Sequence, residues 1–243
     1  MCAVIASIQI GKTQQYCNDG KSWESAIEKL PVAGPIVVLS EGLAGDEQAD
    51  RVHHGGPDKA ILAYNSGYFS VWQEEFPEWS VSGGTFGENL TVDGLNESEV
   101  CIGDVFQIGT VVVQVSQPRQ PCWKLSRKWN IPKLAVLVQM TGRTGWYFRV
   151  LETGSVNSGD QLELFDRLHP EFTVQRAHEI MHAKPRSAED DLLLAQCPSL
   201  SASWREQLQR RALKGQGKSQ SARLFGSGEA KTRSESAESN QSS

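Results

Sequence analysis

The chain lacks acidic side chains over one long stretch. No Asp or Glu occurs from Val105 to Leu151, although 29 of the 243 residues are acidic. The basic residues of this stretch are Arg119, Lys124, Arg127, Lys128, Lys133, Arg143 and Arg149. A net charge of −5 argues against general nucleic-acid binding, which usually involves a strongly basic domain. The pattern therefore predicts a local basic pocket and no nucleic-acid partner.

Paired cysteines are also missing. The five cysteines are Cys2, Cys17, Cys101, Cys122 and Cys197. Their odd number, wide spacing and lack of a C-x-x-C pair argue against a disulfide framework and favour a reducing compartment. The N-terminal residues 1–10 have no basic region and alternate like a strand, which excludes a signal peptide or a membrane span there. We expect a cytoplasmic protein with no membrane partner.

Residues 1–168 have the pattern of a strand-rich domain. Short β-patterned runs separated by Gly, Pro, Asp and Asn clusters are typical of a barrel or a sandwich. These runs are Val4–Ile10, Pro35–Leu39, Ala60–Tyr64, Asn89–Val92, Val105–Ile108, Val111–Val115 and Gln161–Phe165. Helices are expected at Ser66–Glu75 and at Ile131–Met140.

The pattern changes near residue 169. Residues 169–213 contain three short helical patterns, each with a start signal: Thr173, Ser187 and Ser203 are the expected capping residues. Residues 214–243 are rich in Ser, Gly, Lys and Glu and poor in apolar side chains, which predicts a disordered tail.

Cys122 is the most informative single residue. It lies in the segment Gln117–Leu125, directly after the apolar run Val111–Val115 and within the acid-free stretch. A thiol near cationic groups ionises more readily, and the thiolate is the form that attacks electrophiles or binds metal. Pro118 and Pro121 stiffen the segment that presents the sulfur. The alternative is a buried core cysteine at the end of a strand.

Several sequence blocks occur in an order that resembles a known family. They are Gly42–Asp46, Val52–Ala60, Phe86–Leu90, Gly103-Asp104 and Gln117–Leu125. Together they resemble the MOSC domain family, the sulfurase C-terminal domain of molybdenum-cofactor proteins, over about residues 1–165. The region 169–213 is similar to the small α-domain that follows the MOSC domain in the YiiM-like subgroup. The resemblance implies an α+β, mainly β fold, with a barrel-like domain followed by a three-helix domain.

The resemblance also implies a molybdopterin-type cofactor whose metal is bound by Cys122. The expected cofactor-binding residues are Arg119, Lys124, Lys59, Gly55, Gly56, Glu88, Asn89 and Arg143. Soft sulfur suits such a metal, and Arg is a bidentate partner for phosphate or oxo groups. His53 and His54 are catalytic candidates, of which at most one is expected to line the pocket, because adjacent residues of an extended segment face opposite ways.

Similar proteins imply reduction of N-hydroxylated compounds, such as hydroxylaminopurine-like base analogues, with consequent detoxification. The sequence shows no flavin, NAD or iron–sulfur motif, so a separate reductase protein is the expected electron donor. A pocket histidine or Asn89 is expected to manage the proton.

Two alternatives remain open at this point. In one, the protein is a molybdenum-cofactor or sulfur carrier without turnover of its own, and Cys122 holds persulfide sulfur. In the other, His178, Glu179 and His182 form the H-E-x-x-H pattern of a zinc metalloprotease. The second is weakened by its place in a small helical region with little protein to form a cleft, and only Glu206 offers itself as a third ligand.

Overall fold

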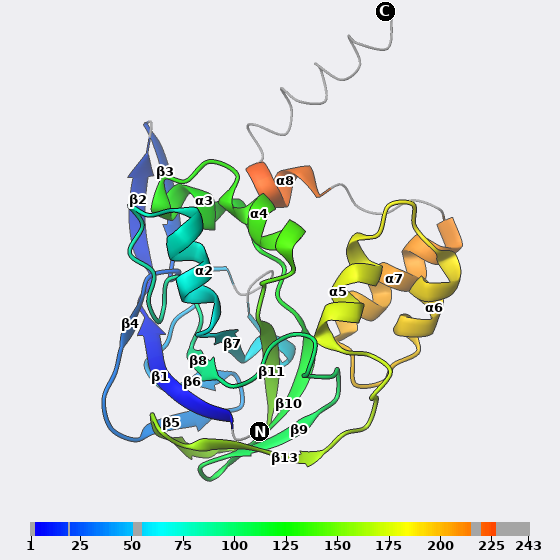
Figure 1. Ribbon diagram of the computed structural model, residues 1–243, viewed down its shortest axis with the longest axis horizontal. Helices are drawn as coiled ribbons and strands as arrows, with labels where there is room; N and C mark the ends of the chain where they lie inside the picture. Colours follow the sequence, from blue (N-terminus) through cyan, green and yellow to red (C-terminus); the bar gives the residue numbers. More distant parts are fainter. Residues whose placement is uncertain (1–2, 19, 51–54, 215–219, 227–243) are drawn as a thin grey trace, which may run out of the picture.

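A computed structural model describes residues 3–18, 20–50, 55–214 and 220–226 (Figure 1). The strands are β1 Ala3–Gly11, β2 Gln14–Asn18, β3 Lys21–Ser25, β4 Lys29–Pro31, β5 Ile36–Leu39, β6 Gly42–Leu43, β7 Ile61–Asn65, β8 Leu90–Asp93, β9 Val105–Ile108, β10 Val111–Pro118, β11 Trp146–Glu152, β12 Gly154–Val156 and β13 Gln161–Asp166. The helices are the 3-10 helix η1 Pro57–Lys59 and the α-helices α2 Tyr68–Glu75, α3 Trp123–Trp129, α4 Leu134–Thr141, α5 Val174–His182, α6 Ala188–Ala195, α7 Ala202–Lys214 and α8 Ser221–Phe225. The strand runs and helices expected in the first 168 residues are all present.

Seven strands close into a barrel in the order β13-β9-β10-β11-β7-β8-β1, because β13 also pairs with β1. Neighbouring strands run antiparallel, except that β7 and β8 run parallel with Ala63 opposite Leu90. A parallel pair needs a crossover connection, and α2 lies in that connection. The α+β, mainly β fold with a barrel-like domain is thereby confirmed.

Apolar side chains fill the barrel interior at every second position. In β10, Val111, Val113 and Val115 are fully buried, while the residues between them are partly exposed. This is the period-two pattern of a strand with one face toward a core. Burial of each such side chain contributes about 1.5–3 kcal/mol. The sequence alternation therefore places β10 in the barrel wall. The residues that follow Pro118 lie at the rim of the barrel.

The helices α2, α3 and α4 form a layer over the end of the barrel that is uppermost in Figure 1. They pack around a second, aromatic core. In it the rings of Tyr64 and Phe86 stack with centroids 4.3 Å apart, and Trp72 Nε1 donates to the Tyr64 hydroxyl at 2.7 Å. Stacked aromatic pairs contribute about 0.5–1.5 kcal/mol beyond burial. This core fixes the position of Phe86, which borders the candidate site.

Two of the three predicted helix caps of residues 169–213 are confirmed. Thr173 Oγ1 accepts from the backbone N of Arg176 at 3.0 Å at the start of α5. Ser187 Oγ accepts from the backbone N of Asp190 at 3.1 Å at the start of α6. Each bond satisfies an amide that has no partner within its own helix.

The predicted cap at Ser203 is wrong by two positions. Helix α7 begins at Ala202, so Ser203 lies within its first turn. Ser201 Oγ instead accepts from the backbone N of Trp204 at 3.4 Å. Both serines precede the apolar run at similar spacing, so the sequence did not distinguish them.

The three-helix region shares its core with the barrel. Val174, Ile180 and Trp204 are buried in the same apolar cluster as the barrel interior. Backbone bonds join the two parts as well, including Ser201 N to Ser116 O at 2.9 Å. The region is therefore packed against the barrel along β10 and is not a free appendage.

The expectation of a disordered tail over 214–243 is corrected for residues 220–226. Helix α8 occupies Ser221–Phe225, and its Leu224 is buried. In Figure 1, α8 (orange-red) lies beside α4 (green), in agreement with the bond from Gln139 Nε2 to Gln220 Oε1 at 2.9 Å. A single buried leucine and a few polar contacts fix this short helix, and neither produces a periodic sequence pattern.

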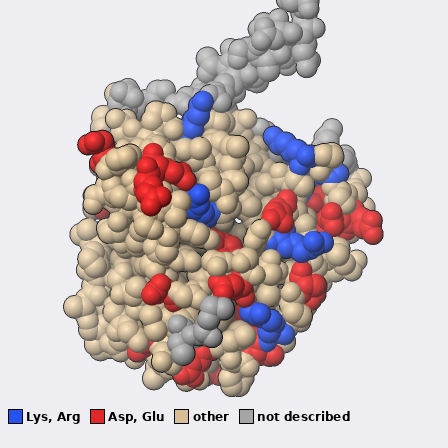
Figure 2. All heavy atoms as spheres, in the orientation of Figure 1, with Lys and Arg blue, Asp and Glu red and all other residues tan. Residues whose placement is uncertain are grey.

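The described surface gives two further facts about partners. No helix in the described ranges combines the length and the apolar character needed to cross a bilayer. On the face drawn in Figure 2, acidic and basic side chains are interspersed and neither sign dominates. The excess of basic residues between 105 and 151 therefore does not appear as a broad positive field on this face.

Candidate active site

Cys122 lies at the wall of a pocket between the barrel rim and the helical layer. Strand β10 ends at Pro118, helix α3 begins at Trp123, and Cys122 is the last extended residue before the helix. Its side chain is 9% exposed and lines a pocket that holds about 680 Å³ of space between protein atoms, its open mouth included. The thiol is thus shielded from bulk solvent but reachable, which differs from a cysteine enclosed among aliphatic side chains.

Arg119 lines the same pocket and is held from two sides. Its backbone N donates to Gly145 O at 3.0 Å, and its Nη2 donates to Phe86 O at 2.8 Å. The side chain is only 6% exposed, yet Nη1 has no hydrogen-bond partner among the described residues. A buried guanidinium nitrogen without a partner is costly, so this atom indicates a missing acceptor. An anionic oxygen that comes within hydrogen-bond distance of this atom would satisfy it.

Tyr147 is a pocket residue that the sequence reasoning missed. It lies on β11, opposite Gln117 of β10, and so faces the chain segment that carries Arg119 and Cys122. Burial raises the pKa of its phenol; the charge of Arg119 lowers it and that of Cys122 raises it. The phenol therefore keeps its proton and can donate a hydrogen bond into the pocket. A tyrosine in an apolar strand carries no motif that would have distinguished it from a core residue.

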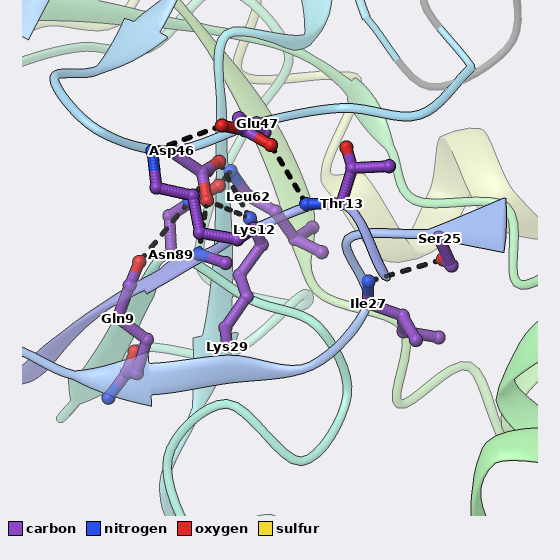
Figure 3. A network of polar contacts seen from close by, with 11 residues as sticks. Gln9, Lys12, Thr13, Ser25, Ile27, Lys29, Asp46, Glu47, Leu62 and Asn89 are labelled. Carbon is purple, nitrogen blue, oxygen red and sulfur yellow. Dashed lines mark hydrogen bonds and ion pairs between the residues drawn. The ribbon is translucent and has the colours of Figure 1, made fainter. Parts of the chain in front are cut away.

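A buried polar network forms another wall of the pocket (Figure 3). Lys29 Nζ lies 2.5 and 2.6 Å from the two carboxylate oxygens of Asp46. Asp46 also accepts from Gly11 N at 2.7 Å and from Asn89 Nδ2 at 2.9 Å. These side-chain partners of Asp46 are distant from it in sequence, and they connect β1, β4 and the residue before β8.

Asn89 lines the pocket, but its amide is fully engaged. Its Oδ1 accepts from Leu62 N at 3.2 Å, and its Nδ2 donates to Gln9 O at 3.3 Å and to Asp46. Lys29, by contrast, carries a titratable proton. Burial lowers the pKa of Lys29, and the charges of Asp46 and Glu88 oppose that shift. Lys29 was not among the predicted site residues, because a lysine in a three-residue strand has no recognisable pattern.

Lys59 and Lys124 both line the pocket. Lys59 ends the 3-10 helix η1, where burial lowers its pKa and the charges of Asp58 and Asp50 raise it. Lys124 is the second residue of α3, two positions after Cys122. Its Nζ donates to Glu24 O at 2.8 Å. The bond connects α3 to the end of strand β3. The next three residues after Glu24, namely Ser25, Ala26 and Ile27, form part of the pocket wall.

The pocket is not uniformly cationic. Asp46, Glu47 and Asp50 also line it, although Asp46 is neutralised by Lys29. Glu47 is paired with Lys12 at the exposed side, with Nζ and Oε1 3.0 Å apart. The acid-free stretch thus supplies one side of the pocket, and the loop after β6 supplies an acidic side.

Glu88 and Arg143, which were expected to bind the cofactor, do not line this pocket in the described structure. Glu88 is buried and accepts from Gly84 N at 2.7 Å and from Phe86 N at 3.0 Å, so its carboxylate holds the loop 84–86 from behind. Burial raises its pKa. Arg143 pairs with Glu75, with Nη1 and Oε1 2.7 Å apart, and its guanidinium stacks on Trp72.

The glycines and histidines of the block before η1 are placed only in part. Gly56 adopts φ 90°, the left-handed region that favours glycine, and lines an adjacent shallow pocket shared with Asp46 and Glu47. Gly55 lines neither pocket. His53 and His54 lie outside the described residues, so which of them faces the site stays a prediction.

The histidines of the H-E-x-x-H pattern have other partners. His178 Nε2 donates to Gln139 O at 2.8 Å, and His182 Nδ1 accepts from Gln220 Nε2 at 3.2 Å. Burial lowers the pKa of both rings, that of His182 to about 3. Glu179 accepts from Gln175. In the described part of the chain, no group of three His, Cys, Asp or Glu residues is arranged to hold a metal ion.

Comparison with known families gives two matches. A model of the MOSC domain matches residues 50–163, and a model of a YiiM-like, 3-alpha helix domain matches residues 172–215. The first covers the pocket residues from Lys59 to Tyr147, and the second covers α5 to α7. Both matches agree with the boundaries at which the structure passes from barrel to helices.

Comparison with individual proteins supports the same grouping. The chain is 46% identical over 203 residues to YflK of Bacillus subtilis, covering 83% of this chain and 90% of that protein. It is 41% identical over 221 residues to YiiM of Escherichia coli, covering 90% and 97%. It is also 34% identical over 202 residues to a protein of Gibberella moniliformis named Reductase, covering 81% of this chain but only 35% of that longer protein.

Solved structures show the same architecture. YiiM of Geobacillus stearothermophilus aligns with a TM-score of 0.74 at 38% identity, covering 86% of this chain and 99% of that one. YiiM of Escherichia coli aligns with a TM-score of 0.78 at 34% identity, covering 93% and 100%. The chain therefore belongs to the MOSC-domain proteins and, within them, to the YiiM-like group with a C-terminal three-helix domain.

Proposed function

We propose that this protein is a molybdenum-cofactor-dependent reductase of N-hydroxylated compounds, such as hydroxylaminopurine-like base analogues, with a role in detoxification. The observation that carries the proposal is the placement of the Cys122 thiol in one pocket with a buried Arg119 that has an unpartnered Nη1. Membership in the MOSC-domain family and the relative named Reductase support it.

The residues present suit such a cofactor. The cofactor brings its own dithiolene sulfurs, so one protein thiolate, Cys122, suffices as the protein ligand. Arg119 Nη1 offers a hydrogen bond to a phosphate or oxo oxygen, and Lys59 and Lys124 add positive charge at the pocket wall. When bound, the cofactor supplies two-electron removal of oxygen from the N–O bond.

The reaction consumes two electrons and two protons and yields an amine and water. Asn89 was expected to manage a proton, but its amide is engaged on both sides and is better suited to orienting Asp46. Two pocket lysines, Lys29 and Lys59, are candidates to release a proton, since burial lowers the pKa of each. The neutral Tyr147 phenol can orient the substrate by a hydrogen bond.

The electrons come from a separate reductase protein. The printed sequence carries no recognisable flavin, NAD or iron–sulfur motif, and this supports an electron donor on another protein. The small-molecule substrate enters at the open mouth of the pocket.

The test is to produce the full chain in a host able to make molybdopterin and to compare wild type with Cys122→Ala. We expect wild type to contain molybdenum and to reduce a hydroxylaminopurine with a supplied reductase. In Cys122→Ala, molybdenum content and reductase activity should each fall more than about 100-fold. Substitution of residues that only hydrogen-bond to metal ligands already costs about 10–100-fold. Cys17→Ala, which alters an exposed free cysteine, is the matched control.

Each contrary outcome has a defined meaning. Equal activity in wild type and Cys122→Ala would rule the proposal out. Persulfide sulfur on Cys122 without molybdenum would identify a sulfur carrier, and zinc that is lost in His178→Ala would identify a metalloprotease. We expect reductase activity per folded molecule to survive His178→Ala, because the His178 ring lies outside the pocket lining.

A further inference from the structure

The C-terminal helix α8 lies against the segment that presents Cys122. Leu224 of α8 is buried, and Gly226 just beyond the helix lies against Trp123, where an added Cβ would be 3.6 Å from the indole ring. Trp123 is the residue directly after Cys122. Helix α8 therefore contacts the cysteine segment from the side away from the barrel strands (Figure 1).

Arg223 makes the specific contacts of this helix. Its Nη1 donates to the carbonyl oxygen of Pro121, and its Nη2 donates to Gln139 Oε1. Pro121 is the residue directly before Cys122, so the two arms of one planar guanidinium connect the cysteine segment to α4. A guanidinium presents its donors in a fixed fork, which sets the relative position of two acceptors more strictly than an ammonium does.

Gln139 extends the connection to the three-helix region. Its side-chain Nε2 donates to Gln220 Oε1 at 2.9 Å, and Gln220 in turn donates to His182. The carbonyl oxygen of Gln139 accepts from His178 Nε2. The two histidines of the H-E-x-x-H pattern thus hold α5 to α4 and to the residue before α8.

We propose that Arg223 and Gln139 are positioning residues that hold the segment 119–122, so that the C-terminal helix fixes where the Cys122 sulfur stands. The proposal rests on the proposed function only in treating Cys122 as the reactive residue. Arg223 acts through the Pro121 carbonyl and need not touch substrate or cofactor. The histidines of the three-helix region contact this network only at its far end, through the Gln139 carbonyl and the Gln220 side chain.

The electrostatic environment of Arg223 agrees with this placement. Burial lowers the pKa of Arg223 to about 10, while the charge of Cys122 raises it and that of Arg119 lowers it. The guanidinium is therefore near enough to the cysteine segment to be influenced by both residues. Its described hydrogen-bond acceptors are all amide or carbonyl oxygens, whose positions it can fix only by geometry.

The primary test is hydrogen exchange, in the full-length protein, of the backbone amides of Arg119 and Leu125, which donate to Gly145 O and to Cys122 O. Arg223→Ala should raise their exchange rates about tenfold relative to wild type, because local opening becomes easier. Arg210→Ala, an exposed arginine of α7, is the matched control and should leave these rates unchanged. Gln139→Leu should give an intermediate increase, and it keeps the test available if Arg223→Ala fails to fold.

A second variant separates geometry from charge. Arg223→Lys keeps the positive charge but loses the two-armed fork, so exchange should stay at least about threefold above wild type. Full restoration of wild-type rates by lysine would overturn the proposed fork. Unchanged rates in both Arg223→Ala and Gln139→Leu would overturn the positioning role altogether.

The catalytic readout distinguishes this proposal from the proposed function. In a wild type that reduces the N-hydroxylated substrate, Arg223→Ala should lower kcat about tenfold and leave KM within about twofold, as expected for a displaced reacting group. A change in KM alone would contradict a role for Arg223 in placing Cys122. If wild type shows no such activity, the proposed function fails, while the exchange rates still decide whether α8 holds the segment.

Discussion

The Cys122 pocket and the His178–His182 pair both offer side chains that bind metals, yet the fold uses them in different ways. Cys122 lines an open pocket beside Arg119, one of whose nitrogens has no partner among the described residues. His178 and His182 each have one ring nitrogen bonded, to Gln139 and to Gln220, while the other ring nitrogen of each is buried without a hydrogen-bond partner in the described part of the chain, and neither ring lines the pocket. The comparison shows that a short motif indicates ligand chemistry, whereas an open pocket indicates which side chains a ligand can reach.

The two regions also differ in how they are assembled. The pocket joins residues far apart in sequence, as in the contacts of Asp46 with Gly11 and Asn89. The helices after residue 172 begin with local caps, in which Thr173 and Ser187 bond amides three residues ahead. Removal of a single pocket contact should therefore disturb several elements, and removal of a cap should disturb one.

The largest effect on stability is expected at Asp46. Asp46→Ala leaves Lys29 buried without its carboxylate and removes the acceptor of Gly11 N and Asn89 Nδ2. Loss of one partner of a buried ion pair costs about 3–5 kcal/mol. Denaturant unfolding of the variant should show this decrease in the free energy of unfolding.

The neighbouring Glu47→Ala is the matched control. Its pair with Lys12 is exposed to solvent and screened, so its loss should lower the free energy of unfolding far less than Asp46→Ala does. Similar decreases in the free energy of unfolding of the two variants would show that the buried network of Asp46 stabilises the fold no more than an exposed ion pair does.

A smaller effect is expected from pH, and it tests the histidine pair. The pKa of His182 is lowered from 6.5 to about 3 on folding, so the unfolded state binds the proton first as the pH falls. The stability contributed by the neutral ring is full above pH 6.5 and is lost progressively toward pH 3. Between pH 7 and pH 5 the loss is about 2 kcal/mol.

The measurement is the free energy of unfolding of wild type and His182→Gln over this pH range. The variant should lack the part of the decrease that His182 causes. Parallel curves for the two proteins would show that the ring is not held neutral by burial.

The smallest effect is expected at the helix caps. Thr173→Ala removes the bond to Arg176 N and should cost about 1 kcal/mol. Ser203→Ala should stay within about 0.5 kcal/mol, because Ser203 lies inside α7 on its exposed side. Thermal unfolding of both variants checks the assignment, and a larger cost at Ser203 would restore it as the cap.

The barrel could be predicted because its long strands carry their own signal. Alternation along β10 follows directly from one buried face. Strands β4 and β6, with three and two residues, have no such signal, since neighbouring strands determine their pairing. Helix α3 was missed because the residue before it, Cys122, makes no side-chain capping bond.

The site could be predicted only where a motif or a charge pattern marked it. Cys122 and Arg119 belong to one segment and were found together. Lys29 and Tyr147 reach the pocket through the pairing of β4 with β1 and of β11 with β10, which local sequence does not encode. The partner of Pro121, Arg223, lies about one hundred residues further along, in a region of low apolar content.

Closure of the barrel by the pairing of β1 with β13 has a consequence for biosynthesis. Ala3 pairs with Leu162, so β1 can pair with β4 and β8 long before β13, its third partner, has left the ribosome. Contacts of such high sequence separation slow folding. The barrel should accordingly close only after β13 has emerged, and the edge of β1 that pairs with β13 stays open until then.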